Sequence, residues 1–102
     1  MNKLYKKGYY YELKVKRLLE NQDYLVWRSP GSKSPIDIIA INEKGFVRLI
    51  QVKSYTKIKK EELEILKKLA NQYQKIQNVE IELWIFKGRK LIISDKKALL
   101  NL

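Results

Sequence analysis

The chain contains no histidine and no cysteine, and these two absences narrow the chemistry that it can perform. Zinc sites, thiol nucleophiles and histidine-based acid–base catalysis depend on these side chains and are therefore excluded. Disulfides are excluded as well, so cysteine content says nothing about the cellular compartment. An enzyme with this sequence would have to use carboxylates, amides and lysine, with or without a hard metal ion.

The sequence also lacks long apolar stretches. No apolar run approaches the roughly 20 residues that cross a membrane, and the first residues (MNKLYKKGYYYELKVKRLLE) lack the apolar core of a signal peptide. We therefore expect an intracellular, cytoplasmic protein with no membrane partner. A length of 102 residues is enough for one domain, residues 1–102, and not for two.

Acidic residues are scarce relative to basic ones: 11 Asp and Glu stand against 22 Lys and Arg, for a net charge of +11. A compact basic domain favours nucleic acid as the partner, and an anionic membrane surface second. A well-solvated, lysine-rich surface is the alternative. Charge alone does not separate these interpretations.

Two β-branched, apolar runs at 36–41 and 46–52 predict a β-hairpin. The short loop between them ends in Gly45, which suits a turn closed by a left-handed residue. This turn places Asp37 directly opposite Gln51. Both faces are mostly apolar, which is typical of central strands covered on both sides. The face opposite to Asp37 is expected to carry Ile36, Ile38, Ala40, Phe46, Ile50 and Val52.

The remaining patterns are typical of an α/β fold. They predict helices at 3–21 and 61–76, strands at 24–27, 79–87 and 90–93, and a short terminal helix that Ser94 and Asp95 can cap. The buried stripe of the first helix is expected to be Leu4, Gly8, Tyr11, Val15, Leu18 and Leu19. We therefore expect a central mixed β-sheet flanked by helices, with the 36–53 hairpin in its middle.

Polar residues cluster at one end of the hairpin. Asp37 and Gln51 offer hard oxygen ligands, and Glu12, at the edge of the first helix's buried stripe, could supply a third. Such a site suits Mg²⁺, with Lys53 holding the attacking water or neutralising charge on a phosphate in transfer. These residue types fit phosphodiester hydrolysis. A cross-strand ion pair between Asp37 and Lys53, with Gln51 beside it, is at least as good an interpretation of the bare pattern.

A polar loop, residues 28–35 (RSPGSKSP), runs into the same end of the hairpin. Its charge, hydroxyls and backbone N–H groups suit contacts with phosphates. A plain surface loop is the alternative, since loops are usually polar. The candidate DNA-binding residues are Arg28, Ser32, Lys33 and Ser34.

Together these residues resemble the PD-(D/E)xK nuclease superfamily, and within it the archaeal Holliday-junction resolvases, including those of archaeal viruses. The similarity covers nearly the whole chain, through KGYYYELKVKRLLE, WRSPGSKSPIDIIAI and FVRLIQVKS. The resemblance implies a restriction-endonuclease-like fold, a homodimer, dependence on Mg²⁺ (or Mn²⁺) and cleavage of four-way DNA junctions.

The resemblance also implies roles for single residues. Glu12 is similar to the family's first-helix glutamate, Asp37 to its first metal ligand and Lys53 to its catalytic lysine. Arg28 resembles the arginine before the family's flexible loop, and Ser32 resembles the loop serine. The chain departs from the pattern at Gln51, where these resolvases usually have glutamate and other branches have glutamine, and at Ile36, where the motif has proline.

Three functions follow as hypotheses. The first is a Mg²⁺-dependent endonuclease that cleaves four-way junctions. The second is a less selective nuclease acting on flaps, nicked duplex or single strands. The third is a DNA-binding module on a decayed nuclease fold that does not cut, against which the intact Asp37 and Lys53 argue.

Overall fold

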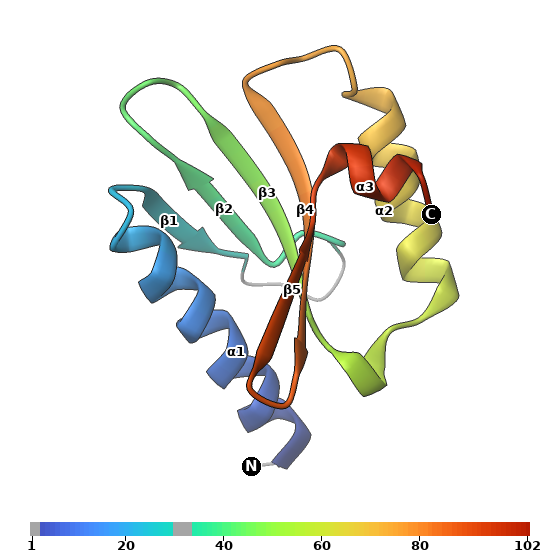
Figure 1. Ribbon diagram of the computed structural model, residues 1–102. Coiled ribbons are helices and arrows are strands. Elements are labelled where there is room, and N and C mark those ends of the chain that lie inside the picture. Colours follow the sequence, from blue (N-terminus) through green and yellow to red (C-terminus); the bar gives the residue numbers. More distant parts are fainter. Residues whose placement is uncertain (1–2, 30–33) are drawn as a thin grey trace.

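The computed structural model describes residues 3–29 and 34–102, which form a mixed α/β fold (Figure 1). In chain order the elements are α1 (Lys3–Glu20), β1 (Leu25–Arg28), β2 (Ile38–Ile41), β3 (Val47–Ser54), the 3-10 helix η1 (Tyr55–Lys57), α2 (Lys60–Gln72), β4 (Val79–Lys87), β5 (Lys90–Ser94) and α3 (Lys96–Leu100). The predicted order of elements is confirmed. Among the described residues, no helix combines the length and the apolarity that a membrane span requires.

Within the described ranges, five strands form one sheet in the order β1-β2-β3-β4-β5. Neighbouring strands are antiparallel except for β3 and β4, which run parallel. A parallel pair needs a crossover connection, and η1 and α2 provide it. The predicted mixed sheet is therefore confirmed, and β3 is its central strand.

The hairpin of β2 and β3 has the predicted register. Ile38 pairs with Ile50, so Asp37 and Gln51 occupy the next opposed positions. The backbone N–H of Asp37 donates to the carbonyl of Ile50 at 2.8 Å and continues the pairing beyond the strand. Gly45 has a φ of 81°, the left-handed conformation that the turn was predicted to require.

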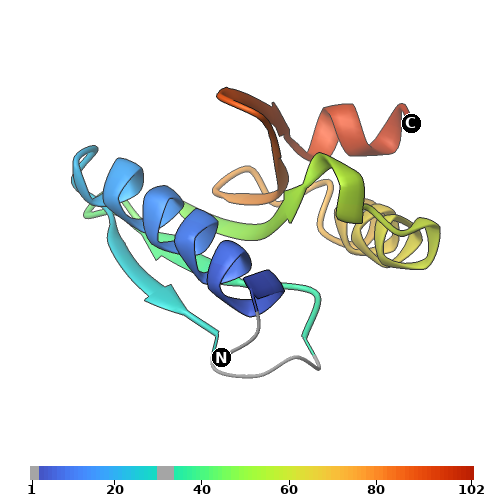
Figure 2. The same ribbon diagram turned by 90° about the horizontal axis from the view of Figure 1, so that it is seen from below.

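Helices cover the two faces of the sheet unequally (Figure 2). α1 packs across β1, β2 and β3 on one face, whereas α2 and α3 pack against β4 on the other. The cluster under α1 contains Val15, Leu19, Val26, Ile38, Ala40, Ile50, Val52, Trp84 and Phe86. The cluster under α2 and α3 contains Ile36, Leu66, Ala70, Ile81, Leu83 and Leu99.

Five predictions about packing are wrong, two of them because Gly8 and Phe46 are exposed. Ile36 belongs to the cluster under α2 instead of the one under α1, because β2 begins only at Ile38 and the alternation of faces does not extend before it. Leu18 is 37% exposed, since the contact of α1 with the sheet is centred on Val15 and Leu19. Ile39 is 38% exposed, because α2 lies over β4 and leaves this face of β2 uncovered.

A polar network joins the two parallel strands on the face under α1. Arg48 of β3 donates from Nε and Nη2 to the two carboxylate oxygens of Glu82 of β4, both at 2.9 Å. The indole N–H of Trp84 also donates to Glu82, at 2.7 Å. The Arg48 guanidinium lies over the rings of Tyr24 and Trp84. The buried Glu82 carboxylate is thus compensated by three N–H donors.

Candidate active site

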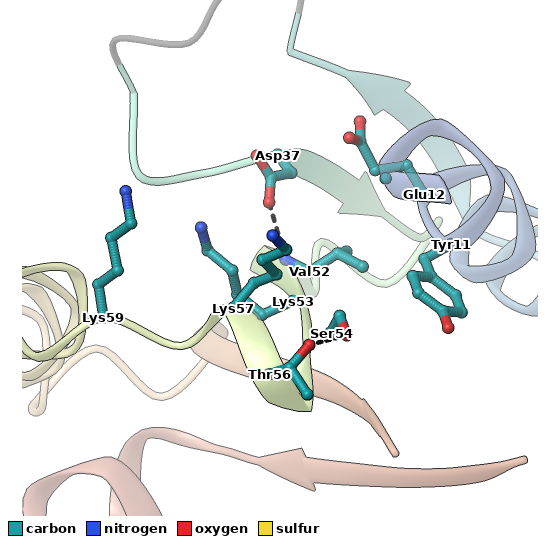
Figure 3. Close-up of a pocket in the computed structure, with 10 residues that line it drawn as sticks. Tyr11, Glu12, Asp37, Val52, Lys53, Ser54, Thr56, Lys57 and Lys59 are labelled. Atoms are coloured by element: carbon teal, nitrogen blue, oxygen red, sulfur yellow. Dashed lines mark hydrogen bonds between the residues drawn. The ribbon is translucent and has the colours of Figure 1, made fainter. Parts of the chain in front are cut away.

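A cavity of about 500 Å³ lies where the end of β3 passes into η1 (Figure 3). α1 forms one wall, the residues before β2 form the second, and the segment from β3 to the start of α2 forms the third. The residues that matter for its chemistry are Glu12, Asp37, Lys53, Thr56, Lys57 and Lys59. Three predicted site residues, Glu12, Asp37 and Lys53, therefore meet in one cavity.

Asp37 is the most perturbed carboxylate of this cavity. Its Oδ2 accepts the backbone N–H of Val52 at 2.8 Å, which fixes the side chain against the end of β3. Burial raises the pKa of Asp37 from 3.8 to about 6, the Val52 hydrogen bond opposes this rise, and the charge of Glu12 adds to it. Lys53 lowers the pKa and Glu62 raises it. Ionising Asp37 is thus costly unless a further cation is present.

Glu12 projects from α1 into the cavity and is held there by Arg28 of β1. Arg28 Nη2 lies 3.2 Å from Glu12 Oε1, and the Arg28 guanidinium is stacked 4.4 Å from the ring centroid of Tyr9. Both partners of the ion pair are partly exposed. The predicted DNA-contacting arginine is therefore bound to a predicted metal ligand, so Glu12 reaches the cavity with part of its charge neutralised.

Lys53 forms an ion pair with Glu62 of α2, through Nζ and Oε2. This carboxylate oxygen is buried, and no hydrogen bond reaches it from the described part of the chain, so the Lys53 ammonium is its one compensating group there. In the described ranges no ion pair joins Lys53 to Asp37. The sequence left open a cross-strand ion pair between Asp37 and Lys53. In the structure, Lys53 of β3 pairs with Glu62 of α2 instead.

Gln51 lies beside this pair instead of in the cavity. It shares the face of β3 that carries Lys53, and its 5% exposure shows that it is nearly sealed. It lines a small hollow under α2 together with Lys53, Glu62 and Leu63. Its role as a metal ligand remains a prediction.

The predicted DNA-binding residues are only partly described. The Arg28 side chain is placed as given above, and the exposed Ser34 accepts the backbone N–H of Ile36 at 3.1 Å. Ser32 and Lys33 lie outside the described residues. Their predicted contact with DNA is untested.

Sequence reasoning missed Glu62 and the lysines that border the cavity. Lys57 extends toward Asp37 from the segment after β3, and Lys59 lines the cavity farther from Asp37 (Figure 3). Lys57, Lys59 and Thr56 belong to a basic connection whose composition was visible in the sequence, although its closeness to Asp37 was not. Glu62 looked like an ordinary acidic residue of a helical first turn.

The donor set fits a divalent cation at Asp37. A carboxylate that is desolvated and repelled by Glu12 and Glu62 gains most when a cation binds to it. Among the described residues, no three acidic side chains gather closely enough to form a complete metal cluster. The coordination would therefore use at most two carboxylates, Asp37 and Glu12, with neutral oxygens and water as the remaining ligands, as Mg²⁺ often does.

Comparison with known families gives a match to "Archaeal holliday junction resolvase (hjc)" over residues 3–93. A curated relative, the crossover junction endodeoxyribonuclease Hjc of Methanocaldococcus jannaschii, is 41% identical over 70 residues, which make up 65% of this chain and 51% of the relative. The chain thus spans about half the length of this relative.

A solved structure is similar over most of the fold. It is that of Hjc from Archaeoglobus fulgidus, described as a Holliday junction resolvase from an archaeal hyperthermophile. The TM-score is 0.65 at 21% identity, with 89% of this chain and 74% of the other covered. The predicted nuclease-like α/β fold is therefore confirmed.

Proposed function

The chain belongs to the archaeal Holliday junction resolvase family, and on this basis we propose that it is a metal-dependent DNA endonuclease that cleaves four-way junctions. One observation carries the proposal: a partly desolvated Asp37, with a pKa near 6, shares a lysine-bordered cavity with Lys53. The net charge of +11 and the exposed Lys57 and Lys59 suit a polyanionic substrate such as DNA. With DNA as its substrate, the protein would act inside the cell.

We propose Mg²⁺ as the cofactor, with Mn²⁺ as a substitute. Asp37 would hold it, with Gln51 and Glu12 as the further ligands that the sequence predicts. Such an ion, when bound, supplies charge stabilisation and a more acidic water. Lys53 would orient the attacking water or stabilise the negative charge that develops on the phosphate. Arg28 would keep Glu12 pointed into the cavity.

Cleavage assays on a labelled four-way junction and on a linear duplex of the same sequence test this function. We expect the junction to be cut with Mg²⁺ or Mn²⁺, the duplex to resist, and EDTA to stop the reaction. Equal cutting of both substrates would indicate a less selective nuclease. Binding without cutting under every condition would indicate a DNA-binding module on a decayed fold.

Gln51→Glu is expected to raise the affinity for Mn²⁺ about tenfold, or roughly 1.4 kcal/mol, while cleavage survives. The added carboxylate would lie opposite Asp37, where related resolvases usually have one. Calorimetric titration of Mn²⁺ into wild type and variant measures the effect. Gln22→Glu adds the same charge at an exposed site after α1 and is the control. An affinity equal to that of the control would contradict a role for Gln51 at the metal.

We propose that the protein acts as a two-fold homodimer. The described part of each chain carries one such cavity, a four-way junction needs two cuts, and two-fold symmetry is the commonest arrangement of small oligomers. Sedimentation should reveal a species with twice the chain mass of 12.2 kDa. A monomer at micromolar concentration, with and without junction DNA, would contradict the proposal.

A further inference from the structure

Glu62 is the nearest negative partner of Lys53 although it belongs to a different element. Lys53 lies near the end of β3, and the strand offers it no carboxylate, because the residue two positions earlier on the same face is the neutral Gln51. α2 begins at Lys60 and places Glu62 in its first turn, beside the end of β3. The contact spans two elements that the parallel crossover brings together.

The surroundings of Glu62 favour a specific contact over a surface ion pair. Oε2 of Glu62 is buried, and the Lys53 side chain is only 21% exposed. Gln51 and Leu63 line the same small hollow and restrict solvent there. An ion pair in such a position is screened less than an exposed pair and restricts the lysine to few conformations.

The ion pair also separates the charges of the site. Asp37 Oδ2 is bonded to the Val52 N–H, and Glu12 is paired with Arg28. Since Lys53 is bound to Glu62, the Asp37 carboxylate is not closed off by a direct ion pair with the lysine. Lys53 still lines the cavity, so its ammonium is held at the wall where a phosphate would lie.

We propose that Glu62 is a positioning residue for Lys53 and supplies from α2 the negative charge that β3 lacks at Gln51. This inference rests on the proposed nuclease function. Within it, Glu62 acts through the lysine and touches neither DNA nor the reacting atoms. A carboxylate at position 51 could therefore take over the role, because Gln51 and Glu62 border the same hollow beside Lys53.

Four proteins test the proposal: wild type, Glu62→Gln, Glu61→Gln, and the double variant Gln51→Glu/Glu62→Gln. Glu61 is the matched control, because it is exposed, lies in the same helical turn and loses the same charge on substitution. Single-turnover cleavage of a saturating junction complex gives the rate, and a binding titration gives the affinity.

Glu62→Gln is expected to cut at least tenfold more slowly than Glu61→Gln, with the same junction affinity. At saturating metal, where the tighter metal binding expected of Gln51→Glu no longer affects the rate, the double variant should recover to within about threefold of wild type, which a purely structural glutamate would not allow. Equal rates for the two single variants, or a double variant as slow as Glu62→Gln, would overturn the inference. A wild type that does not cut would instead overturn the proposed function and the inference with it.

Thermal melting of each variant guards against a folding defect. If Glu62→Gln melts below the assay temperature, Glu62→Asp replaces it, because this variant keeps the charge and shortens its reach. A slow Glu62→Asp protein would support the proposal, and a wild-type rate would overturn it.

Discussion

Asp37→Asn is expected to abolish junction cleavage and, at the same time, to make the metal-free protein more stable. The Asp37 carboxylate is the proposed principal metal ligand and is fixed at the cavity by the Val52 N–H, so its loss should slow cleavage by roughly a thousandfold or more. Asparagine keeps a side-chain oxygen for the Val52 N–H, so the local fold should survive. Single-turnover rates and Mn²⁺ titration measure the loss.

The gain in stability follows from the raised pKa. Folding raises the pKa of Asp37 from 3.8 to about 6, so the folded protein binds the proton more tightly than the unfolded chain does. This contribution to stability is complete below pH 3.8 and is lost as the pH rises through 6. Asparagine has no charge to bury, so Asp37→Asn avoids this loss of folding stability. The loss is at most about 3 kcal/mol, and about 1–2 kcal/mol after screening by solvent.

Thermal melts in EDTA at pH 8 and pH 4 check this part. The variant should melt several degrees above wild type at pH 8, and the difference should nearly vanish at pH 4. Asp23→Asn is the control, because Asp23 is exposed, has a φ of 67°, and asparagine tolerates this conformation well. Equal stability of Asp37→Asn and wild type at pH 8 would contradict the raised pKa.

Lys53→Ala is expected to slow cleavage by about 100- to 1000-fold, the cost of removing one preorganised donor from a developing anion. Junction affinity should stay within about threefold of wild type, because the lysine acts on the transition state more than on bound DNA. Single-turnover cleavage and a binding titration separate the two effects.

Lys67→Ala is the matched control for this experiment. It removes the same charge, and Lys67 lies on α2, where it contacts Glu64 and the carbonyl of Leu102 away from the cavity. Both variants should therefore bind the junction equally well, and only Lys53→Ala should lose cleavage. An active Lys53→Ala protein would show that the lysine has no part in the reaction.

The hairpin could be predicted in detail because local rules determine it. A glycine at position 45 fixes the turn, the turn fixes the register, and the register places Asp37 opposite Gln51. The cap of α3 follows a similarly local rule: Asp95 accepts the backbone N–H of Ala98 at 2.9 Å, as predicted. Each of these features depends on a few neighbouring residues.

The contacts of the site could not be predicted, because they depend on how distant elements dock. Glu62 meets Lys53 only because the parallel crossover returns α2 over the end of β3. Arg28 meets Glu12 only because α1 lies across β1. Alternation along β3 correctly placed Gln51 on the face that carries Lys53. It did not indicate whether this face opens into the cavity or lies under α2.

The ion pair between Arg48 and Glu82 also favours one register of β3 against β4. Each hairpin can form locally, whereas the parallel pairing of β3 with β4 must wait for the crossover and is the non-local, slower event. A slip of two residues would keep the alternation of faces and would offer Arg48 the carboxylate of Glu80 instead. In that alignment Glu82 would take the place of Trp84, so the carboxylate bound to Arg48 would lose the indole N–H. The native alignment of β3 with β4 is therefore favoured over this slip when the two strands pair.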